Sequence, residues 1–335
     1  MYHKRVLYLG YYLKELDWVK LRNFLNYVSV NEKKSKLQLV SDMFTSSLKY
    51  NISLLEYFQF RFYKLNKVER EEYAGTGFMY EYHLRMNPKT SRNVLEDKRQ
   101  FLNHYGEFVR HRFASLQDLE KDPELATLLL SNASGKVVLK SSSGQCGNGI
   151  EIRDSKDFTI ETLISRLKST ENDLVEEFVL QHTSLDKLSP SGLNTIRIFT
   201  QLTSDNKVEI LGSRLRITVN SSVDNLAAGN IAAPINVESG QIDGPAVYSD
   251  ITKREEAVHP ITNVKIVGFQ IPFWSETIRM VEQAALKNVG NRSIGWDVAI
   301  TNSGPELIEG NHNWCKLLWQ LPVKKGLKKE LLKYI

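Results

Sequence analysis

The sequence predicts an α+β fold in which a helical N-terminal region precedes mixed strands and helices. Three observations support this prediction. The first 88 residues carry amphipathic helical patterns and few Gly or Pro residues. From Lys136 onward, segments rich in β-branched residues alternate with helical segments. Neighbouring strands in that part look antiparallel, so an α+β fold fits better than a doubly wound parallel sheet.

Residues 1–88 are expected to form the helical region. The stretches 18–28 and 53–65 have the spacing of amphipathic helices rather than of strands. A turn-rich break at 86–93, MNPKTSRN, precedes a predicted helix, VLEDKRQFLNHYG, that ends at Gly106.

The rest of the chain is expected to form two mixed units, over 89–175 and 176–324, and a basic tail over 325–335. The predicted strands are 136–141, 150–153, 173–181, 193–203 and 207–220. The predicted helices are 156–169 and 275–290, the second with Ser275 as N-cap and Gly290 as its stop. Residues 295–311 are expected to form a hairpin with the turn Asn-Ser-Gly-Pro.

Composition and charge fit an ordinary globular protein. The chain has 335 residues, of which 41% are hydrophobic and 25% charged, so it is long enough for two or three packed units. Cys146 and Cys315 lie far apart and give no disulfide framework. No apolar run reaches the roughly 18 residues of a membrane span, and no signal-peptide cleavage site is apparent, so we expect a cytoplasmic protein.

The net charge of +5 could favour an anionic partner, but it does not indicate nucleic-acid binding. Part of this charge lies in the basic tail, where Leu327, Leu331 and Leu332 could form one apolar stripe. We expect a terminal helix that docks on the body and turns its lysines to solvent. Peripheral contact of the tail with a membrane surface is the alternative.

A phosphate-binding loop is indicated after the strand that ends at Lys140. Glycines and serines follow in SSSGQCGNG. Glycines let backbone N–H groups wrap an anion, and the lysine adds a positive charge, which suits a polyphosphate. The spacing matches neither a Walker A motif nor a dinucleotide fingerprint, and a mobile hairpin loop with a surface lysine is the alternative. The loop residues concerned are Ser143, Gly144, Gly147 and Gly149.

The predicted hairpin brings oxygen-bearing side chains together. Glu309 and Asn311 are two residues apart in a strand and therefore face the same side, while Asp297 lies in the partner strand. Such groups are costly to bury unless something pairs with them. Magnesium prefers carboxylate and carbonyl oxygens, so these residues are candidate ligands. The alternative is that they cap turns or pair with Arg or Lys.

Charged residues within other predicted strands add to this pattern. Arg197, Arg214 and Arg216 lie in strands, and the last two share a face. One such arginine is best explained by a cross-strand ion pair, whereas a cluster near a phosphate loop is better explained by anion binding. Glu176 and Glu177 end another strand, either as a solvated edge or as a hinge whose backbone contacts a nucleobase.

In their order along the chain, these features resemble the ATP-grasp superfamily of carboxylate–amine ligases, over about residues 92–320. The resemblance implies an ATP-grasp fold, ATP as the nucleotide and two Mg²⁺ ions. The stretch 56–73, together with DKRQF and NTIRIF, is similar to the sugar-transfer-associated ATP-grasp subgroup. Members of that subgroup are associated with capsule, O-antigen and exopolysaccharide assembly in bacteria.

The resemblance also implies roles for individual residues. The nucleotide lysines would be Lys98, in LEDKRQF, and Lys140. Adenine would meet the side chain of Glu176 and the backbone of Glu177 and Val179. The acceptor segment would contain Asn225 and Gly229, and the magnesium ligands would be Asp297, Glu309 and Asn311.

Two departures from the family pattern leave alternatives open. An acidic residue for the ribose is missing at its usual place, so His182 or Asp186 must substitute for it. Some ligases carry an arginine two residues before the first metal aspartate, where this chain has Gly295. Contact with the transferred phosphate therefore falls to Arg197, Arg214 or Arg216.

The implied reaction uses ATP to join a carboxylate to an amine through an acyl phosphate. The expected partners are a small-molecule carboxylate and an amine or sugar acceptor. A kinase that acts on a hydroxyl group with the same scaffold is one alternative, and a non-catalytic nucleotide-binding partner of a glycosyltransferase is another. No nucleophilic Ser or Cys is required, and Cys146 is taken as incidental.

Overall fold

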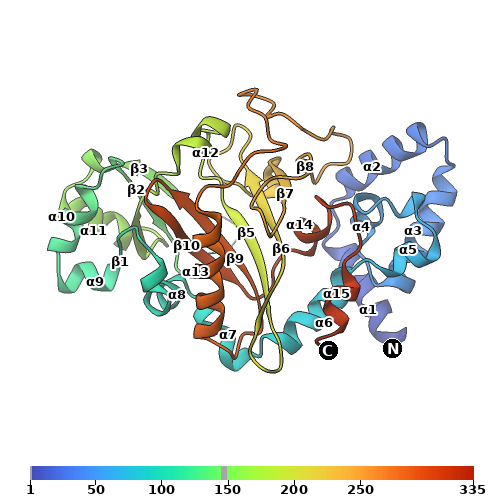
Figure 1. Ribbon diagram of the computed structural model, residues 1–335, viewed down its shortest axis with the longest axis horizontal. Helices are drawn as coiled ribbons and strands as arrows, with labels where there is room; N and C mark the ends of the chain where they lie inside the picture. The colour runs from blue at the N-terminus through green and yellow to red at the C-terminus, as the bar shows by residue number, and fades with distance from the viewer. Residues whose placement is uncertain (1, 145–148) are drawn as a thin grey trace.

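The computed structural model describes residues 2–144 and 149–335. Figure 1 shows three parts side by side: a small mixed unit at the left, a large sheet in the centre and a helical region at the right. The predicted α+β fold is confirmed. Within the described residues, no helix is both long and apolar enough to cross a membrane.

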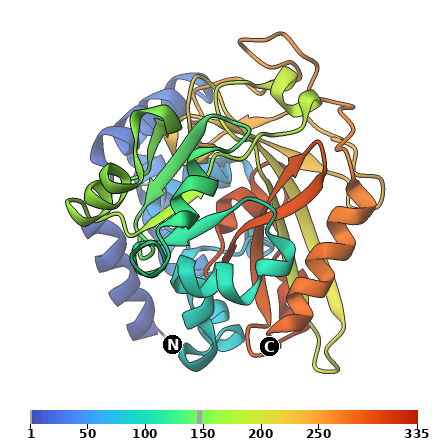
Figure 2. The same ribbon diagram turned by 90° about the vertical axis from the view of Figure 1, so that its left-hand side faces the viewer.

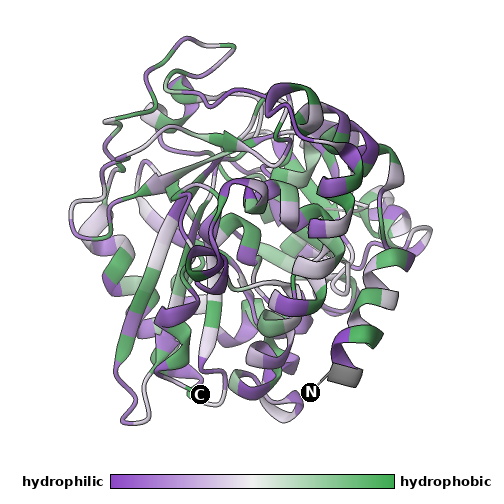
Figure 3. Ribbon diagram, turned by 90° about the vertical axis from the view of Figure 1, so that its right-hand side faces the viewer, coloured by the Kyte–Doolittle hydropathy of each residue, from purple (hydrophilic) through white to green (hydrophobic). Residues whose placement is uncertain are grey.

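The helical region has a core of its own. Large side chains such as Phe24, Tyr57 and Phe58 are fully buried in it. Asp17 caps the second helix by accepting a hydrogen bond from the backbone N–H of Lys20 at 2.9 Å. In Figure 3, hydrophobic and hydrophilic residues alternate along these helices, as amphipathic helices require. The helices are α1 (Tyr2–Lys14), α2 (Trp18–Asn31), α3 (Lys36–Tyr50), α4 (Leu54–Gln59), α5 (Lys67–Glu71) and α6 (Thr76–Met86).

The helix predicted over 53–65 is wrong in length, because α4 ends at Gln59. Arg61 has a left-handed φ of 55°, and a short 3₁₀ turn follows it. Phe58, Phe60 and Phe62 are all buried. A straight helix would turn residues two apart to different sides, so burying all three requires the break.

The segment between the helical region and the first sheet also differs from expectation. The predicted break at 86–93 contains the start of α7 (Lys89–Glu96), and the helix predicted to end at Gly106 is α8 (Lys98–His104). Asp97 is extended and separates the two helices. Its carboxylate accepts from the backbone N–H groups of Arg99 and Gln100, at 2.8 and 3.2 Å, and so caps α8.

The small mixed unit is an antiparallel sheet of four strands in the order β1-β4-β2-β3. Helices α9, α10 and α11 cover one of its faces through a shared apolar core (Figure 2). The strand predicted over 173–181 is shorter than expected, because only Leu174–Glu177 form it, with residues 174–176 paired on both sides. The strands are β1 (Phe113–Ser115), β2 (Lys136–Lys140), β3 (Glu151–Asp154) and β4 (Leu174–Glu177). The helices are α9 (Leu116–Lys121), α10 (Glu124–Leu130) and α11 (Ile160–Lys168).

The central sheet has six antiparallel strands in the order β10-β9-β5-β6-β7-β8. Helix α13 packs on one face, and the rings of Phe199, Trp314 and Trp319 pack on the other. The predicted hairpin is confirmed, but its turn is shorter than Asn-Ser-Gly-Pro, because Gly304 pairs with Thr301 and Pro305 with Ile300. The strands are β5 (Ile196–Leu202), β6 (Val208–Ile217), β7 (Ile231–Ile235), β8 (Val247–Tyr248), β9 (Ser293–Thr301) and β10 (Gly304–Asn311). The remaining helices are α12 (Thr183–Leu188), α13 (Trp274–Lys287), α14 (Lys316–Gln320) and α15 (Lys328–Leu332).

The predicted ends of α13 are wrong. Phe273, with a left-handed φ of 53°, stands at the N-cap position in place of Ser275, and the helix ends before Gly290. At the end of the chain, the prediction of a docked terminal helix is confirmed. Leu331 of α15 is buried, and Lys329 and Lys333 each lie 2.9 Å from a carboxylate of the body.

A buried histidine links the two sheets. His111 precedes β1, and its Nδ1 lies 2.7 Å from Oε2 of Glu306 in β10. Its Nε2 lies 3.5 Å from Oε2 of Glu176 in β4, which makes a charge contact rather than a good hydrogen bond. Burial alone would lower the pKa of His111, but the two carboxylates outweigh it and raise the pKa to about 9. The imidazolium is therefore part of the junction between the sheets.

This junction predicts a pH-dependent stability. Because the pKa of His111 is raised from 6.5 to about 9 by folding, its contribution is complete below pH 6.5 and is lost as the pH rises through about 9. The loss corresponds to at most about 3 kcal/mol. Urea unfolding of the wild type and of His111→Gln across this pH range will measure it. The variant should be less stable at low pH and lack this dependence; equal slopes in both proteins would contradict the assignment.

Candidate active site

Strand register places the predicted metal ligands next to one another. Glu309 of β10 pairs directly with Asp297 of β9, and Asn311 pairs with Gly295. An irregularity between Leu307 and Glu309 sets this register. The Asn311 side chain donates to Oε1 of Glu309 at 3.2 Å. The three predicted ligands thus form one cluster at the end of the hairpin.

Two arginines hold the aspartate of this cluster. Arg197 donates from Nε to Oδ1 of Asp297 and from Nη2 to Oδ2, the latter at 2.9 Å. Arg216 donates to the same Oδ2 at 2.8 Å. Burial would raise the pKa of Asp297, but the two guanidinium groups lower it to about 2. Asp297 is therefore an ionised carboxylate, although only 1% of it is exposed.

Glu309 is compensated less than Asp297. Burial and the neighbouring charge of Asp297 raise its pKa, and the arginines offset only part of this effect. A divalent cation between the two carboxylates would remove this repulsion. The amide oxygen of Asn311 accepts no hydrogen bond from the described residues, so it is free to act as a third ligand. The donor set of two carboxylates and one amide oxygen fits Mg²⁺.

Across 2–144 and 149–335, no three His, Cys, Asp or Glu side chains come together as a metal site. A site built only from these residue types is therefore not present in that part of the chain. The hairpin cluster reaches three oxygen ligands because it includes an asparagine.

Close packing around the hairpin requires glycine at two positions. A Cβ at Gly310 would lie 2.9 Å from Cδ2 of Leu95 on the opposite face of β10. A Cβ at Gly295 would lie 2.6 Å from Cβ of Trp314 and 3.1 Å from Cδ of Arg197. The absence of an arginine at position 295 is thus a packing requirement, because Arg197 and Trp314 occupy that space.

Arg214 is not brought to the cluster. Its guanidinium is buried and donates to the backbone carbonyl of Trp319, from Nε at 3.1 Å, and to that of Ser213. Burial lowers its pKa to about 10. Of the three strand arginines, Arg197 and Arg216 contact the metal candidates, whereas Arg214 satisfies the last turn of α14.

The two predicted nucleotide lysines lie near each other. Lys98 opens α8 and donates to the carbonyl groups of Ser141 and Gly144 at the base of the loop. Lys140 ends β2 and lies 2.6 Å from Oε2 of Glu176. The pKa of Lys98 is lowered by burial and by the charge of Lys140, and Glu309 offsets part of this effect. Two cations that repel each other beside the metal candidates are suited to hold phosphate groups.

The loop between the lysine and β3 is described at both ends. Ser142 donates from its backbone and its hydroxyl group to Asp173, at 2.7 and 2.8 Å, which fixes the start of the loop. Ser143 is exposed, and Gly144 closes a turn on Ser141. Gly149 has a φ of 76°, which favours glycine. Gly147 and Cys146 lie outside the described residues.

The predicted adenine hinge contains one free backbone segment. The backbone N–H of Glu177 donates to the carbonyl of Arg112, and its carboxylate accepts from the same residue. Among the described residues, the backbone groups of Val179 have no hydrogen-bond partner. Glu176 faces Lys140 and His111, and these two groups lower its pKa to about 2 against the effect of burial. Val179 is therefore the hinge position best able to contact a base edge.

The two ribose candidates differ in their surroundings. The ring of His182 accepts a hydrogen bond from the backbone N–H of Ser184 at 3.1 Å and caps α12. Asp186 is exposed, and its carboxylate accepts a hydrogen bond from the side-chain amide of Gln181 at 3.4 Å. Both remain candidates, with Asp186 the freer of the two.

The predicted acceptor segment, which contains Asn225 and Gly229, follows a residue that contacts Arg216. Asn225 caps a short 3₁₀ turn, Leu226–Ala228, and Gly229 ends it with a φ of 89°. The preceding residue, Asp224, is the anchor that the sequence analysis missed. Its carboxylate accepts from the backbone of Thr195 at 3.0 Å and lies 3.2 Å from Nη2 of Arg216.

Other functional candidates were also missed. His111, Asp173 and Glu306 take part in the contacts at the lysines and between the sheets. An acidic residue within an apolar strand, such as Glu306 in GPELI, was an available signal for a buried ion pair. His111 had no comparable signal, because its partners lie 65 and 195 positions away.

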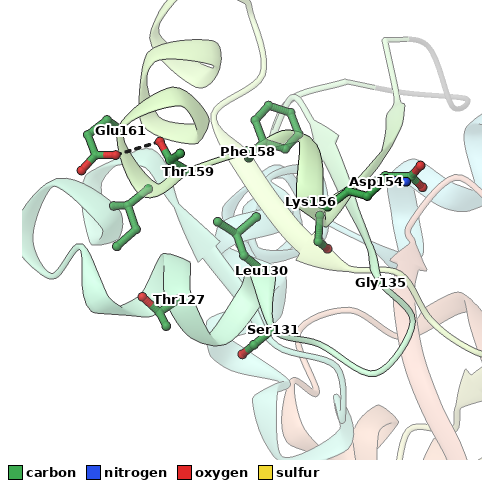
Figure 4. Close-up of a pocket in the computed structure, with 11 residues that line it drawn as sticks. Thr127, Leu130, Ser131, Gly135, Asp154, Lys156, Phe158, Thr159 and Glu161 are labelled. Carbon is green, nitrogen blue, oxygen red and sulfur yellow. Dashed lines mark hydrogen bonds between the residues drawn. The ribbon is translucent and has the colours of Figure 1, made fainter.

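A large pocket of the small mixed unit is not at this cluster. It measures about 810 Å³ and lies on the outer side of the small unit, between α10 and the start of α11 (Figure 4). The hydrogen bond drawn in Figure 4 joins the hydroxyl of Thr159 to Glu161 at 2.7 Å and belongs to the helix start. The charged cluster, rather than cavity size, identifies the candidate active site.

Solved structures of several enzymes resemble the chain at low identity. One is the biotin carboxylase of Campylobacter jejuni, with 11% identity, a TM-score of 0.46 and coverage of 86% of this chain and 58% of that one. Another is the biotin carboxylase domain of 2-oxoglutarate carboxylase from Hydrogenobacter thermophilus, with 15% identity, a TM-score of 0.39 and coverage of 69% and 45%. A third is D-alanyl-alanine synthetase A of Vibrio cholerae, with 12% identity, a TM-score of 0.40 and coverage of 72% and 61%.

The chain thus spans about half of each of these longer proteins, and the scores support no detail of the site. No curated protein matches the chain significantly. The model of the sugar-transfer associated ATP-grasp family matches residues 153–335, more than half of the chain, and this range includes all three candidate metal ligands. The chain therefore belongs to the sugar-transfer associated ATP-grasp family.

Proposed function

We propose that this protein is an ATP- and Mg²⁺-dependent ligase that joins a carboxylate to an amine, on a sugar or a polysaccharide precursor. The observation that carries the proposal is the cluster of Asp297, Glu309 and Asn311, with Arg197 and Arg216 bound to its aspartate. The family's association with sugar transfer supports the sugar part.

The residues of the cluster supply binding and charge rather than covalent catalysis. Asp297, Glu309 and Asn311 would hold Mg²⁺, which neutralises charge that develops on phosphate oxygens. Lys98 and Lys140 would hold the phosphate groups of ATP. Because Arg197 and Arg216 keep Asp297 ionised and fixed in place, the cluster is pre-organised.

The proposed reaction has two steps. An oxygen of the substrate carboxylate forms a bond to the γ-phosphorus of ATP, and the bond from that phosphorus to ADP breaks. The amine nitrogen then bonds to the carbonyl carbon, inorganic phosphate leaves and the nitrogen loses a proton. The products are ADP, phosphate and an amide, which distinguishes the ligase from a kinase that would leave a phosphate ester.

The first experiment is a screen for ADP release with Mg²⁺ over amino acids and uronic acids, with products identified by mass. Glu309→Gln should lower ADP release by about 100-fold or more, because it removes a charged ligand from the metal candidates. Glu276→Gln, an exposed carboxylate of α13, is the matched control and should leave the rate unchanged. Undiminished ADP release in Glu309→Gln would rule out the proposed catalytic role.

A second variant separates binding from stability. Lys98→Met should weaken Mg·ATP binding by about tenfold or more, because it removes a charge-assisted contact to phosphate. It should not destabilise the fold, since burial and Lys140 already disfavour the charge of Lys98. Calorimetric titration with Mg·ATP, together with urea unfolding, checks both parts. The exposed Lys89→Met serves as control, and wild-type affinity in Lys98→Met would refute this role.

A further inference from the structure

Two pockets lie between the helical region and the outer strand of the central sheet, where β8 faces α2 and α4 in Figure 1. The larger measures about 490 Å³ and the smaller about 200 Å³. Both are lined by Tyr248, Asp250 and Lys253, so they adjoin each other along the segment 248–253. We call the two together the edge groove.

The edge groove carries an excess of positive charge. Glu255 contacts Arg61 at 3.4 Å and Lys324 at 2.5 Å, and Lys64 lies 2.6 Å from Glu32, so these three cations are already paired. In the part of the chain that the structure describes, Lys20, Lys253 and Arg254 have no carboxylate within 4.0 Å. The lining cations are Lys20, Arg61, Lys64, Lys253, Arg254 and Lys324, against the carboxylates Asp17, Asp250 and Glu255.

Its uncharged lining suits a hydroxyl-rich ligand. Tyr248 is half-buried and presents an aromatic ring, with Nζ of Lys253 at 4.5 Å from the ring centroid. The amide of Asn23 adds donors and an acceptor, and the hydroxyl oxygens of Ser249 and Thr252, which donate within the protein, add acceptors. A sugar ring matches this combination, because it has an apolar C–H face and hydroxyl groups at its edges.

A chain of contacts connects the edge groove to the metal cluster. Ser249 donates to the carbonyl of Leu226 at 3.2 Å, and Ala227 and Gly229 of the same turn line the larger pocket. Asp224, at the start of this segment, lies 3.2 Å from Arg216, which in turn donates to Asp297 at 2.8 Å. The helical region takes part in this series of contacts through Gln59, which donates to the carbonyl of Ser249 at 3.1 Å.

We infer that the edge groove binds the acceptor as an anionic sugar, that is, a glycan unit that bears a phosphate or a carboxylate group. The inference rests on the proposed function and adds the location and charge of the acceptor. Lys20, Lys253 and Arg254 contact the anionic group, and Tyr248 contacts the sugar ring. The helical region therefore forms one wall of the acceptor site.

The experiment is binding of the full chain to an array of neutral, carboxylate-bearing and phosphate-bearing glycans. The wild type should bind anionic glycans in preference to neutral ones, and the preferred class identifies the anion. The double variant Lys20→Gln/Lys253→Gln should bind them about tenfold more weakly or worse, through loss of two charge-assisted contacts. Lys253→Gln alone, at an exposed position, should show part of this loss without any effect on folding.

The exposed Lys265→Gln, outside the edge groove, is the matched control and should bind as the wild type does. Equal binding of neutral and anionic glycans, or wild-type binding by the double variant, would overturn the inference. Mg·ATP binding should stay unchanged in the double variant. Glycan binding without ADP release would overturn the proposed ligase while supporting the groove, so the two failures are distinguishable.

Discussion

The site depends on one row of charged residues that crosses four strands. Glu309 pairs with Asp297, Asp297 with Arg197, and Arg197 with Arg214, from β10 through β9 and β5 to β6. Arg216 lies two residues further along β6 on the same face and also reaches Asp297. Because side chains alternate along a strand, a slip of one residue at any pairing would turn part of the row to the opposite face. The register of the sheet therefore determines whether the cluster exists.

Such a row is costly to bury, and the surrounding structure compensates for it unequally. Asp297 has two guanidinium partners, which outweigh its desolvation, whereas Glu309 keeps a raised pKa. Arg214, at the far end of the row, turns to the carbonyl of Trp319 instead. The uncompensated charge is thus confined to Glu309, at the end nearest Lys98. An incoming cation gains most at the position where the fold leaves a negative charge unpaired.

The sequence predicted this cluster because its residues are close in the chain or alternate along strands. Glu309 and Asn311 follow a period of two, and Asp297 precedes them by one hairpin. The contacts that it could not predict join elements far apart, such as His111 with Glu306 and Asp224 with Arg216. Helix ends were missed for a related reason. The break at Arg61 and the start of α13 after Phe273 use left-handed backbone at residues that carry no glycine signal, and tertiary packing decides them.

The junction between the sheets bears on how a nucleotide would be held. Glu176 contacts both Lys140 and His111, and His111 also contacts Glu306. If Lys140 turns to a phosphate group, as we propose, a buried carboxylate without a second partner would be left unpaired at a cost of several kcal/mol. His111 lowers that cost because it stays charged beside Glu176, although it shares its single charge with Glu306. In this proposal the histidine makes it less costly for the lysine to exchange a carboxylate for a phosphate, and its contact with Glu306 continues to join the two sheets.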